Sequence, residues 1–192
     1  MALIDSRGSG YLKPLSTVEV DTESALIDFV SQLTGLEKTR IRWAWTPRPG
    51  SPISFDEDWC AIGLLKVTSA QPYRVGKKGV VEDPESGDTT HVTHQTLTVS
   101  FSFYGRHAAD LADLFRDGAQ LNQNFNALSA KGLTIQAVSA EAVRIPDLVG
   151  NQWRDRYMLE LKIGRVVSRR FGVRTIASAG FEIHTEKGKI NA

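Results

Sequence analysis

Residues 94–103 read HQTLTVSFSF, in which polar and apolar residues alternate from Thr96 onward. Four apolar residues share one face of this stretch: Leu97, Val99, Phe101 and Phe103. Side chains of a strand point alternately to its two faces, so the pattern predicts a strand with one buried side. The remaining elements are placed relative to this strand.

An amphipathic helix is expected directly after the strand. Tyr104-Gly105 ends the alternation, and apolar or small residues then recur at three- and four-residue steps: Leu111, Leu114, Phe115 and Gly118. The opposite side carries three acidic residues, Asp110, Asp113 and Asp117. This spacing is typical of a helix that lays an apolar stripe on a sheet and turns its acidic face to solvent or to another subunit.

Helix caps and period-two patterns predict the other elements. Asp21 and Gly35 bound a first helix, and Gly132 ends a short helix that follows the amphipathic one. Alternating residues predict strands at 41–45, 60–68, 133–137 and 156–166. Leu64 and Leu65, on opposite faces, favour a central position for the second of these strands. The last strand is expected to turn back in a hairpin at Ser168-Arg169-Arg170.

These elements predict an α+β fold with a mainly antiparallel sheet packed by two or three helices. A proline-rich loop is expected at 47–52, and residues 73–90, which are polar and rich in turn formers, predict a long loop between two strands that pair as a hairpin. We expect an extended N-terminal arm at 1–20, a single domain at 21–181 and a loose C-terminal tail at 182–192.

Composition excludes several classes of protein. The chain has 192 residues, of which 41% are hydrophobic, and its 23 basic and 22 acidic residues give a formal net charge of +1. Such a balance offers no global attraction to nucleic acid or to an anionic membrane. Neither a signal peptide nor a membrane span is expected, and Cys60 is the single cysteine, so the cytoplasm is the expected compartment.

No catalytic motif is present, and each candidate group has a simpler interpretation. The acidic run Asp56-Glu57-Asp58 can bind Mg²⁺, yet a solvated loop is favoured. His91 and His94 lie three residues apart on a strand and face opposite sides, and Cys60 is expected to be a buried small side chain. No metal or cofactor is therefore expected. A cluster of arginines at the last strand suits either phosphates or an acidic protein surface: Arg165, Arg169, Arg170 and Arg174.

The chain resembles the neck or tail terminator family of tailed bacteriophages over roughly residues 20–181. Four segments carry the resemblance: 95–105 (QTLTVSFSFYG), 114–118 (LFRDG), 145–148 (IPDL) and 153–156 (WRDR). None of them is catalytic. The resemblance implies a non-enzymatic structural subunit of the virion, located at the head–tail junction and assembled in the cytoplasm of a bacterial host.

The resemblance also implies partners. The family is expected to form a homo-oligomeric ring, with six subunits, that caps the tail tube and joins it to the head connector, and DNA passes non-specifically through the ring. No membrane contact is expected. Charged residues on loops and strand ends are the candidate contacts with other subunits and partners, since such charges steer association: Arg40, Arg42, Lys77, Lys78, Glu82, Asp83, Glu85, Asp88, Arg169 and Arg170.

Three alternatives stay open from the sequence. Another ring component of the same apparatus, such as a tail-tube or head-completion protein, can share the fold. A metal-dependent hydrolase would use Asp56, Asp58 and a histidine. A DNA-binding accessory protein would use the arginine cluster and show a steep salt dependence.

Overall fold

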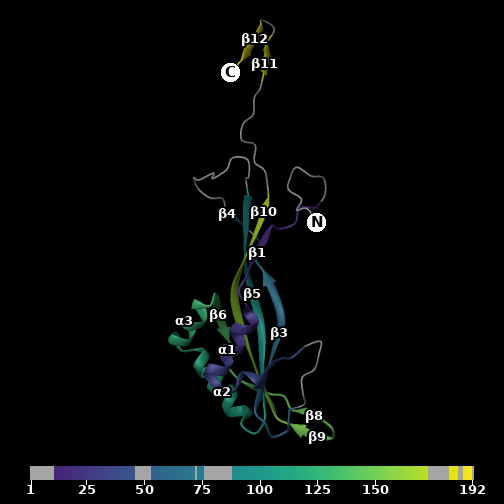
Figure 1. Ribbon diagram of the computed structural model, residues 1–192. Coiled ribbons are helices and arrows are strands. Elements are labelled where there is room, and N and C mark those ends of the chain that lie inside the picture. The colour runs from purple at the N-terminus through teal and green to yellow at the C-terminus, as the bar shows by residue number, and fades with distance from the viewer. Residues whose placement is uncertain are drawn as a thin grey trace. The chain divides into compact units, whose positions relative to one another are not determined.

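The computed structural model describes residues 11–45, 53–71, 73–75, 88–172, 182–185 and 188–191; at 73–75, at 88 and from 182 onward it describes the backbone alone. Within these ranges three α-helices and a mixed, mostly antiparallel sheet form an α+β fold (Figure 1), as the sequence predicts. The chain divides into two compact units. The larger unit comprises Glu19–Pro72 and Thr93–Val167, and the smaller one comprises the remaining segments.

Eight of the described strands form one sheet in which β10 and β5 lie next to each other at the centre, followed by β3 and β2. Strand β2 runs parallel to β3, whereas β3 and β5 pair antiparallel, as the predicted hairpin requires. On the other side, β6 and β7 pair antiparallel with β10. The bounds of these strands are β2 Ile41–Trp43, β3 Trp59–Ser69, β5 Asp88–Tyr104, β6 Leu133–Val138, β7 Val143–Arg144 and β10 Arg156–Gly172. The part of β5 before Thr93 and the part of β10 after Val167 belong to the smaller unit.

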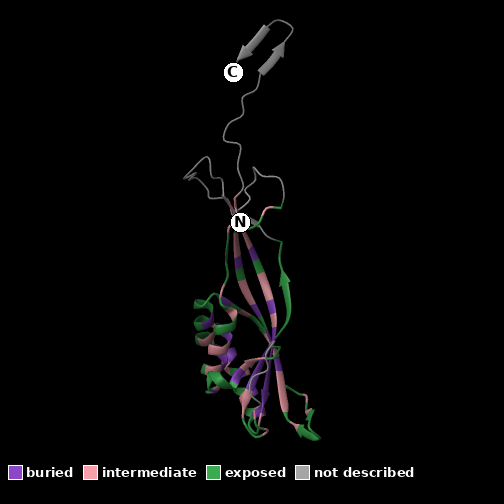
Figure 2. Ribbon diagram, turned by 45° about the vertical axis from the view of Figure 1, so that its right-hand side comes forward, coloured by how far each residue is buried: buried purple, intermediate pink, exposed green. Residues whose placement is uncertain are grey.

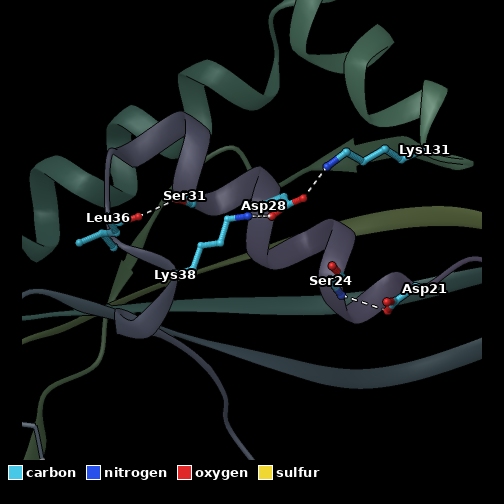
Figure 3. Close-up of polar contacts among 7 residues, drawn as sticks. All are labelled: Asp21, Ser24, Asp28, Ser31, Leu36, Lys38 and Lys131. Carbon is cyan, nitrogen blue, oxygen red and sulfur yellow. Dashed lines mark hydrogen bonds and ion pairs between the residues drawn. The ribbon is translucent and has the colours of Figure 1, made fainter.

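Helix α1 (Thr22–Thr34) begins and ends where its caps predict. The Asp21 carboxylate accepts a hydrogen bond from the Ser24 N–H at 3.1 Å (Figure 3). Gly35 adopts a left-handed φ of 75°, and its N–H donates to the Ser31 carbonyl. Both contacts satisfy backbone groups that a helix end leaves without partners. The first helix is therefore determined locally.

Helices α2 (Ala108–Ala119) and α3 (Asn122–Ala130) lie with α1 on one face of the sheet (Figure 1). The predicted apolar face of β5 is fully buried, and buried residues gather where helices and sheet meet (Figure 2). The predicted stripe of α2 is only partly correct, because Leu114 is 52% exposed. Small residues replace it in the contact with the core: Ala108, Ala112 and Ala119, beside the buried Phe115.

The predicted last hairpin is wrong. Strand β10 continues through Ser168, Arg169 and Arg170 to Gly172 without turning. In the smaller unit these three residues pair with β1 (Ser16–Val18), so that Arg169 faces Thr17 and Arg170 faces Ser16. The polar run looked like a turn, but a partner strand from the N-terminal segment satisfies its backbone groups. The same pairing places residues 16–18 of the expected N-terminal arm in a strand.

Other boundaries also differ from the predictions. The predicted strand at 41–45 is shorter, and Arg40 belongs to a 3₁₀ turn, η1 (Lys38–Arg40). Residues 73–75 form β4, which pairs with β5, so the predicted loop at 73–90 is shorter at both ends. The tail forms an antiparallel pair, β11 (Glu182–Thr185) and β12 (Gly188–Asn191), where a loose segment was expected. The proline-rich loop at 47–52 lies outside the described residues.

Strand β3 is central only over its first half. Because β2 pairs with Cys60, Ala61 and Ile62 alone, the rest of β3 has β5 on a single side. Leu64 and Leu65 are accordingly 38% and 46% exposed, which corrects the prediction of a central position for this part of the strand.

Asp28 ties three elements of the larger unit together. Its carboxylate lies 2.8 Å from Lys131 Nζ, after α3, and 2.5 Å from Lys38 Nζ, in η1 (Figure 3). The hydrogen bond from Lys131, and next that from Lys38, lowers the pKa of Asp28 to about 2. A carboxylate with a depressed pKa contributes stability above its ordinary pKa and loses that contribution as the pH falls through the depressed value.

We expect Asp28→Asn to lower the stability of the fold at neutral pH, because the substitution removes the charge that both lysines face. The difference from the unsubstituted protein should stay constant above about pH 4 and shrink as the pH falls towards about 2. Chemical denaturation at a series of pH values measures it. Lys131→Gln, which leaves Lys38 in place, should show a smaller loss of stability over the same pH range. If the loss caused by Asp28→Asn stayed unchanged at pH 2, the ion pairs of Asp28 would not be its cause.

Candidate functional site: an apolar groove and an exposed hairpin

A groove of about 490 Å³ opens in the larger unit beside the start of α1. Strand β2 ends at Trp43, the Ala44 N–H donates to the Ile62 carbonyl, and the Trp45 ring lies close to Gly63, which has no side chain to occupy that space. Trp45 is 68% exposed. We call this surface the Trp groove, and its apolar lining consists of Val20, Trp43, Trp45, Leu64, Leu97 and Val99.

The rim of the Trp groove is mainly acidic. Glu19, Asp21 and Glu23 line it from the segment that leads into α1. Across from them, Arg165 donates hydrogen bonds to Thr22 Oγ1 at 3.1 Å and to Gln95 Oε1 at 2.9 Å, and its Nη2 lies 3.9 Å from a Glu19 oxygen. Arg165 is thus held by contacts within the subunit, and the rim retains an excess of negative charge.

A small hairpin provides a second apolar surface. Strands β8 (Asp147–Val149) and β9 (Gln152–Arg154) form a separate two-stranded sheet. Its turn residues, Gly150 and Asn151, have φ values of 56° and 65°, and positive φ at both central residues is the mark of a type I′ turn. Leu148 and Trp153 stand opposite each other in register and are 59% and 70% exposed. We call this element the Leu148–Trp153 hairpin.

Charged contacts hold the base of the Leu148–Trp153 hairpin. Asp147 pairs with Arg156 at 3.2 Å, and Asp155 pairs with Arg144 at 2.6 Å. Arg154 donates to the carbonyl of Ile53 and places its guanidinium 4.3 Å from the centre of the Phe55 ring. The hairpin is therefore fixed at its base while it presents two large apolar side chains to solvent.

The acidic run at 56–58 serves the turn between β5 and α2. Asp58 accepts a hydrogen bond from the His107 backbone N–H at 3.0 Å and lies 2.7 Å from His107 Nδ1, while Asp56 lies 3.1 Å from Arg106 Nε. Burial acts to raise the pKa of Asp58, but the hydrogen bonds from His107 outweigh it and the pKa is lowered. These carboxylates position the start of α2.

The other candidate groups, His91 and Cys60, also lie in contacts that belong to the fold. The His91 ring lies 5.1 Å from the Phe171 ring, and Cys60 is fully buried, which raises the pKa of its thiol. In the described part of the chain no three His, Cys, Asp or Glu side chains gather in a way that suits a metal ion. Of the helices in the described ranges, none combines the length and apolar character needed to cross a bilayer.

Comparison with known protein families decides which kind of protein carries these surfaces. A family model described as "Phage neck terminator protein" matches residues 23–188, most of the chain. The chain belongs to this family. No curated protein matches it with significant similarity. Membership of the neck terminator family confirms the resemblance found in the sequence and makes the protein a non-enzymatic, structural component of the phage virion neck, whose partners are other proteins of virion assembly.

The contact residues predicted from the sequence for this neck terminator lie in several places. Arg40 is exposed in η1, Arg42 lies in β2, and Arg169 and Arg170 lie within β10. None of these four residues lines the Trp groove. The remaining candidates lie outside the residues whose side chains are described: Lys77, Lys78, Glu82, Asp83, Glu85 and Asp88.

Sequence reasoning missed both surfaces of the neck terminator. A signal for the hairpin is present, because Gly150-Asn151 between two short segments that contain large apolar residues is a hairpin signature. The Trp groove has no comparable signal. Its lining comes from β2, β3 and β5 and from the segment before α1, which only the sheet order brings together.

Proposed function

We propose that the protein is a ring-forming terminator at the head–tail junction, which caps the tail tube and joins it to the head connector. The family match over residues 23–188 carries this proposal. A ring built from identical subunits in head-to-tail contact needs two different surfaces on each subunit. The Trp groove and the Leu148–Trp153 hairpin support the proposal as two such surfaces.

A ring of six subunits, contacting the tail-tube protein on one side and connector proteins on the other, is the arrangement we propose. Its lumen passes DNA without sequence recognition. A net charge of +1 suits this role, since a strongly basic lumen would hold the DNA rather than let it pass. We assign protein contacts to the arginines at 165–174 for the same reason, and Arg165 already bonds to Thr22 and Gln95 within the subunit.

Within this proposal, partner contacts are made by the charged residues named from the sequence. Two regions carry most of them: Arg169 and Arg170 on β10, and residues 76–88. We retain residues 1–20 and 182–192 as arms flanking a domain at 21–181. Charged groups at the rim of an interface steer and align partners more than they add affinity.

Electron microscopy of the purified protein and of intact particles tests the proposed ring. A ring of this protein at the head–tail junction, with six-fold averages, is the expected result. Native mass spectrometry counts the subunits independently. Particles in which antibodies against this chain label another part of the virion would contradict the proposed position.

We expect deletion of residues 76–87, with Val75 joined to Asp88 by a Gly-Asn turn, to leave the thermal unfolding midpoint unchanged but to impair head–tail joining. The segment lies between β4 and β5, so both strands stay intact. In a complementation assay the yield of joined particles should fall by about tenfold or more, the factor that corresponds to losing ~1.4 kcal/mol of contact free energy. A second variant, in which a Gly-Ser linker of equal length replaces residues 76–87, separates the effect of lost charge from the effect of lost length. Full yield from the deletion variant would refute the role of these residues.

A further inference from the structure

We propose that the Leu148–Trp153 hairpin of one subunit inserts its apolar pair into the Trp groove of the next subunit in the ring. This inference rests on the proposed ring and deepens it by naming the contact that joins neighbouring copies. The occupant of the groove is thus a second copy of this chain.

Apolar complementarity is the first argument. Leu148 and Trp153 are 59% and 70% exposed and form the middle pair of a two-stranded element. The Trp groove has a volume of about 490 Å³, and its exposed apolar side chains are Trp45 and Leu64. A buried tryptophan contributes about 150–250 Å² of contact area, and such aromatic anchors in pockets dominate the free energy of protein interfaces.

Charge complementarity is the second argument. The segment from Val143 to Arg156, which carries the hairpin, has three arginines and two aspartates. The rim of the groove has three carboxylates, Glu19, Asp21 and Glu23, and one guanidinium, that of Arg165. The segment as a whole therefore carries one net positive charge, whereas the rim of the groove is net negative, which aligns the two surfaces and disfavours contact between like surfaces.

The rigidity of the hairpin is the third argument. Its type I′ turn and the ion pairs at its base hold Leu148 and Trp153 in place before any contact forms. A surface fixed in advance loses little conformational entropy on binding. Because the hairpin and the groove are different surfaces of one subunit, each copy can bind one neighbour through each, and repetition of the contact gives a ring rather than a closed pair.

Cysteine cross-linking in assembled particles tests the contact. A variant that carries both Leu148→Cys and Leu64→Cys is incorporated into particles and treated with a short bismaleimide. Cys60 stays in place because it is fully buried. We expect a ladder of linked species that extends beyond the dimer, whereas each single variant should give no ladder. The pair Leu148→Cys with Leu114→Cys is the matched control, since Leu114 is also exposed, at 52%, but lies on α2.

A second measurement compares the yield of subunit rings from variants substituted at Trp153. Trp153→Ala should lower the yield of subunit rings by about tenfold or more. Trp153→Phe should keep most of the yield, because phenylalanine still provides an aromatic anchor for the groove. Rings that form without a ladder, or a link from Leu148→Cys to a different virion protein, would overturn the inference. Electron microscopy of the unsubstituted particles separates these results from failure of the proposed function, in which no ring is seen.

Discussion

Replacing Phe115 with alanine is expected to lower the free energy of unfolding by about 3–5 kcal/mol, the range found for buried phenylalanines. Phe115 is fully buried in α2 and contacts three other rings. Its ring centroid lies 4.7 Å from that of Phe101, 5.5 Å from that of Phe103 and 5.6 Å from that of Phe29. The substitution therefore opens a cavity where α1, α2 and β5 meet, and rigid strands on one side limit how far it can collapse.

Leu114→Ala is the matched control for this prediction. Leu114 lies next to Phe115 in α2 but is 52% exposed, so its truncation should change the free energy of unfolding by no more than about 0.5 kcal/mol. Chemical denaturation of both variants measures the contrast. Equal losses at the two positions would show that α2 packs with a different face from the one described.

Gly105→Ala is expected to cost about 3 kcal/mol or more. Gly105 follows β5 with a φ of 106°, a conformation in which an L side chain is strained by about 1–3 kcal/mol. A Cβ atom there would also lie 2.6 Å from the Glu57 carbonyl oxygen and 2.7 Å from the Asp58 Cα, both backbone atoms that cannot rotate away. The variant must shift the acidic run and disturb the hydrogen bond that the His107 N–H, at the start of α2, donates to Asp58.

Gly35→Ala provides the comparison for Gly105. Gly35 also has a positive φ, of 75°, but a Cβ atom there would meet nothing within 4 Å. Only the backbone strain remains, which predicts a loss of about 1–2 kcal/mol. Thermal or chemical unfolding of the two variants measures the difference, and a Gly105→Ala variant no less stable than Gly35→Ala would contradict the close approach of the acidic run.

Local patterns in the sequence were sufficient for several elements. Helix α1 could be placed by Asp21 and Gly35, because each forms its capping contact within the helix it bounds. The buried face of β5 could be read from its alternation, because an antiparallel strand under helices has one dry side. The family resemblance also came from residues that the family model covers.

Errors arose where distant segments decide the structure. Arg169 and Arg170 remain in a strand because residues 16 and 17, far away in the chain, pair with them. Leu114 was assigned to the buried stripe by spacing alone, yet small alanines bring α2 close to its neighbours and leave the leucine outside. The exposure of Leu64 follows from the short length of β2, which no pattern within β3 records.

The sequence by itself determined the fold class, the caps of the first helix, the buried face of the central strand and the family. Each of these depends on patterns or motifs formed by residues that lie close together in the chain. Only the tertiary structure decided the two surfaces on which the proposed ring depends. The Trp groove is assembled from five separate segments. The Leu148–Trp153 hairpin exposes its apolar pair in a fixed position because contacts of Arg144, Arg154 and Arg156 hold its base. Such contacts depend on distances in space, which the spacing of residues along the chain does not encode.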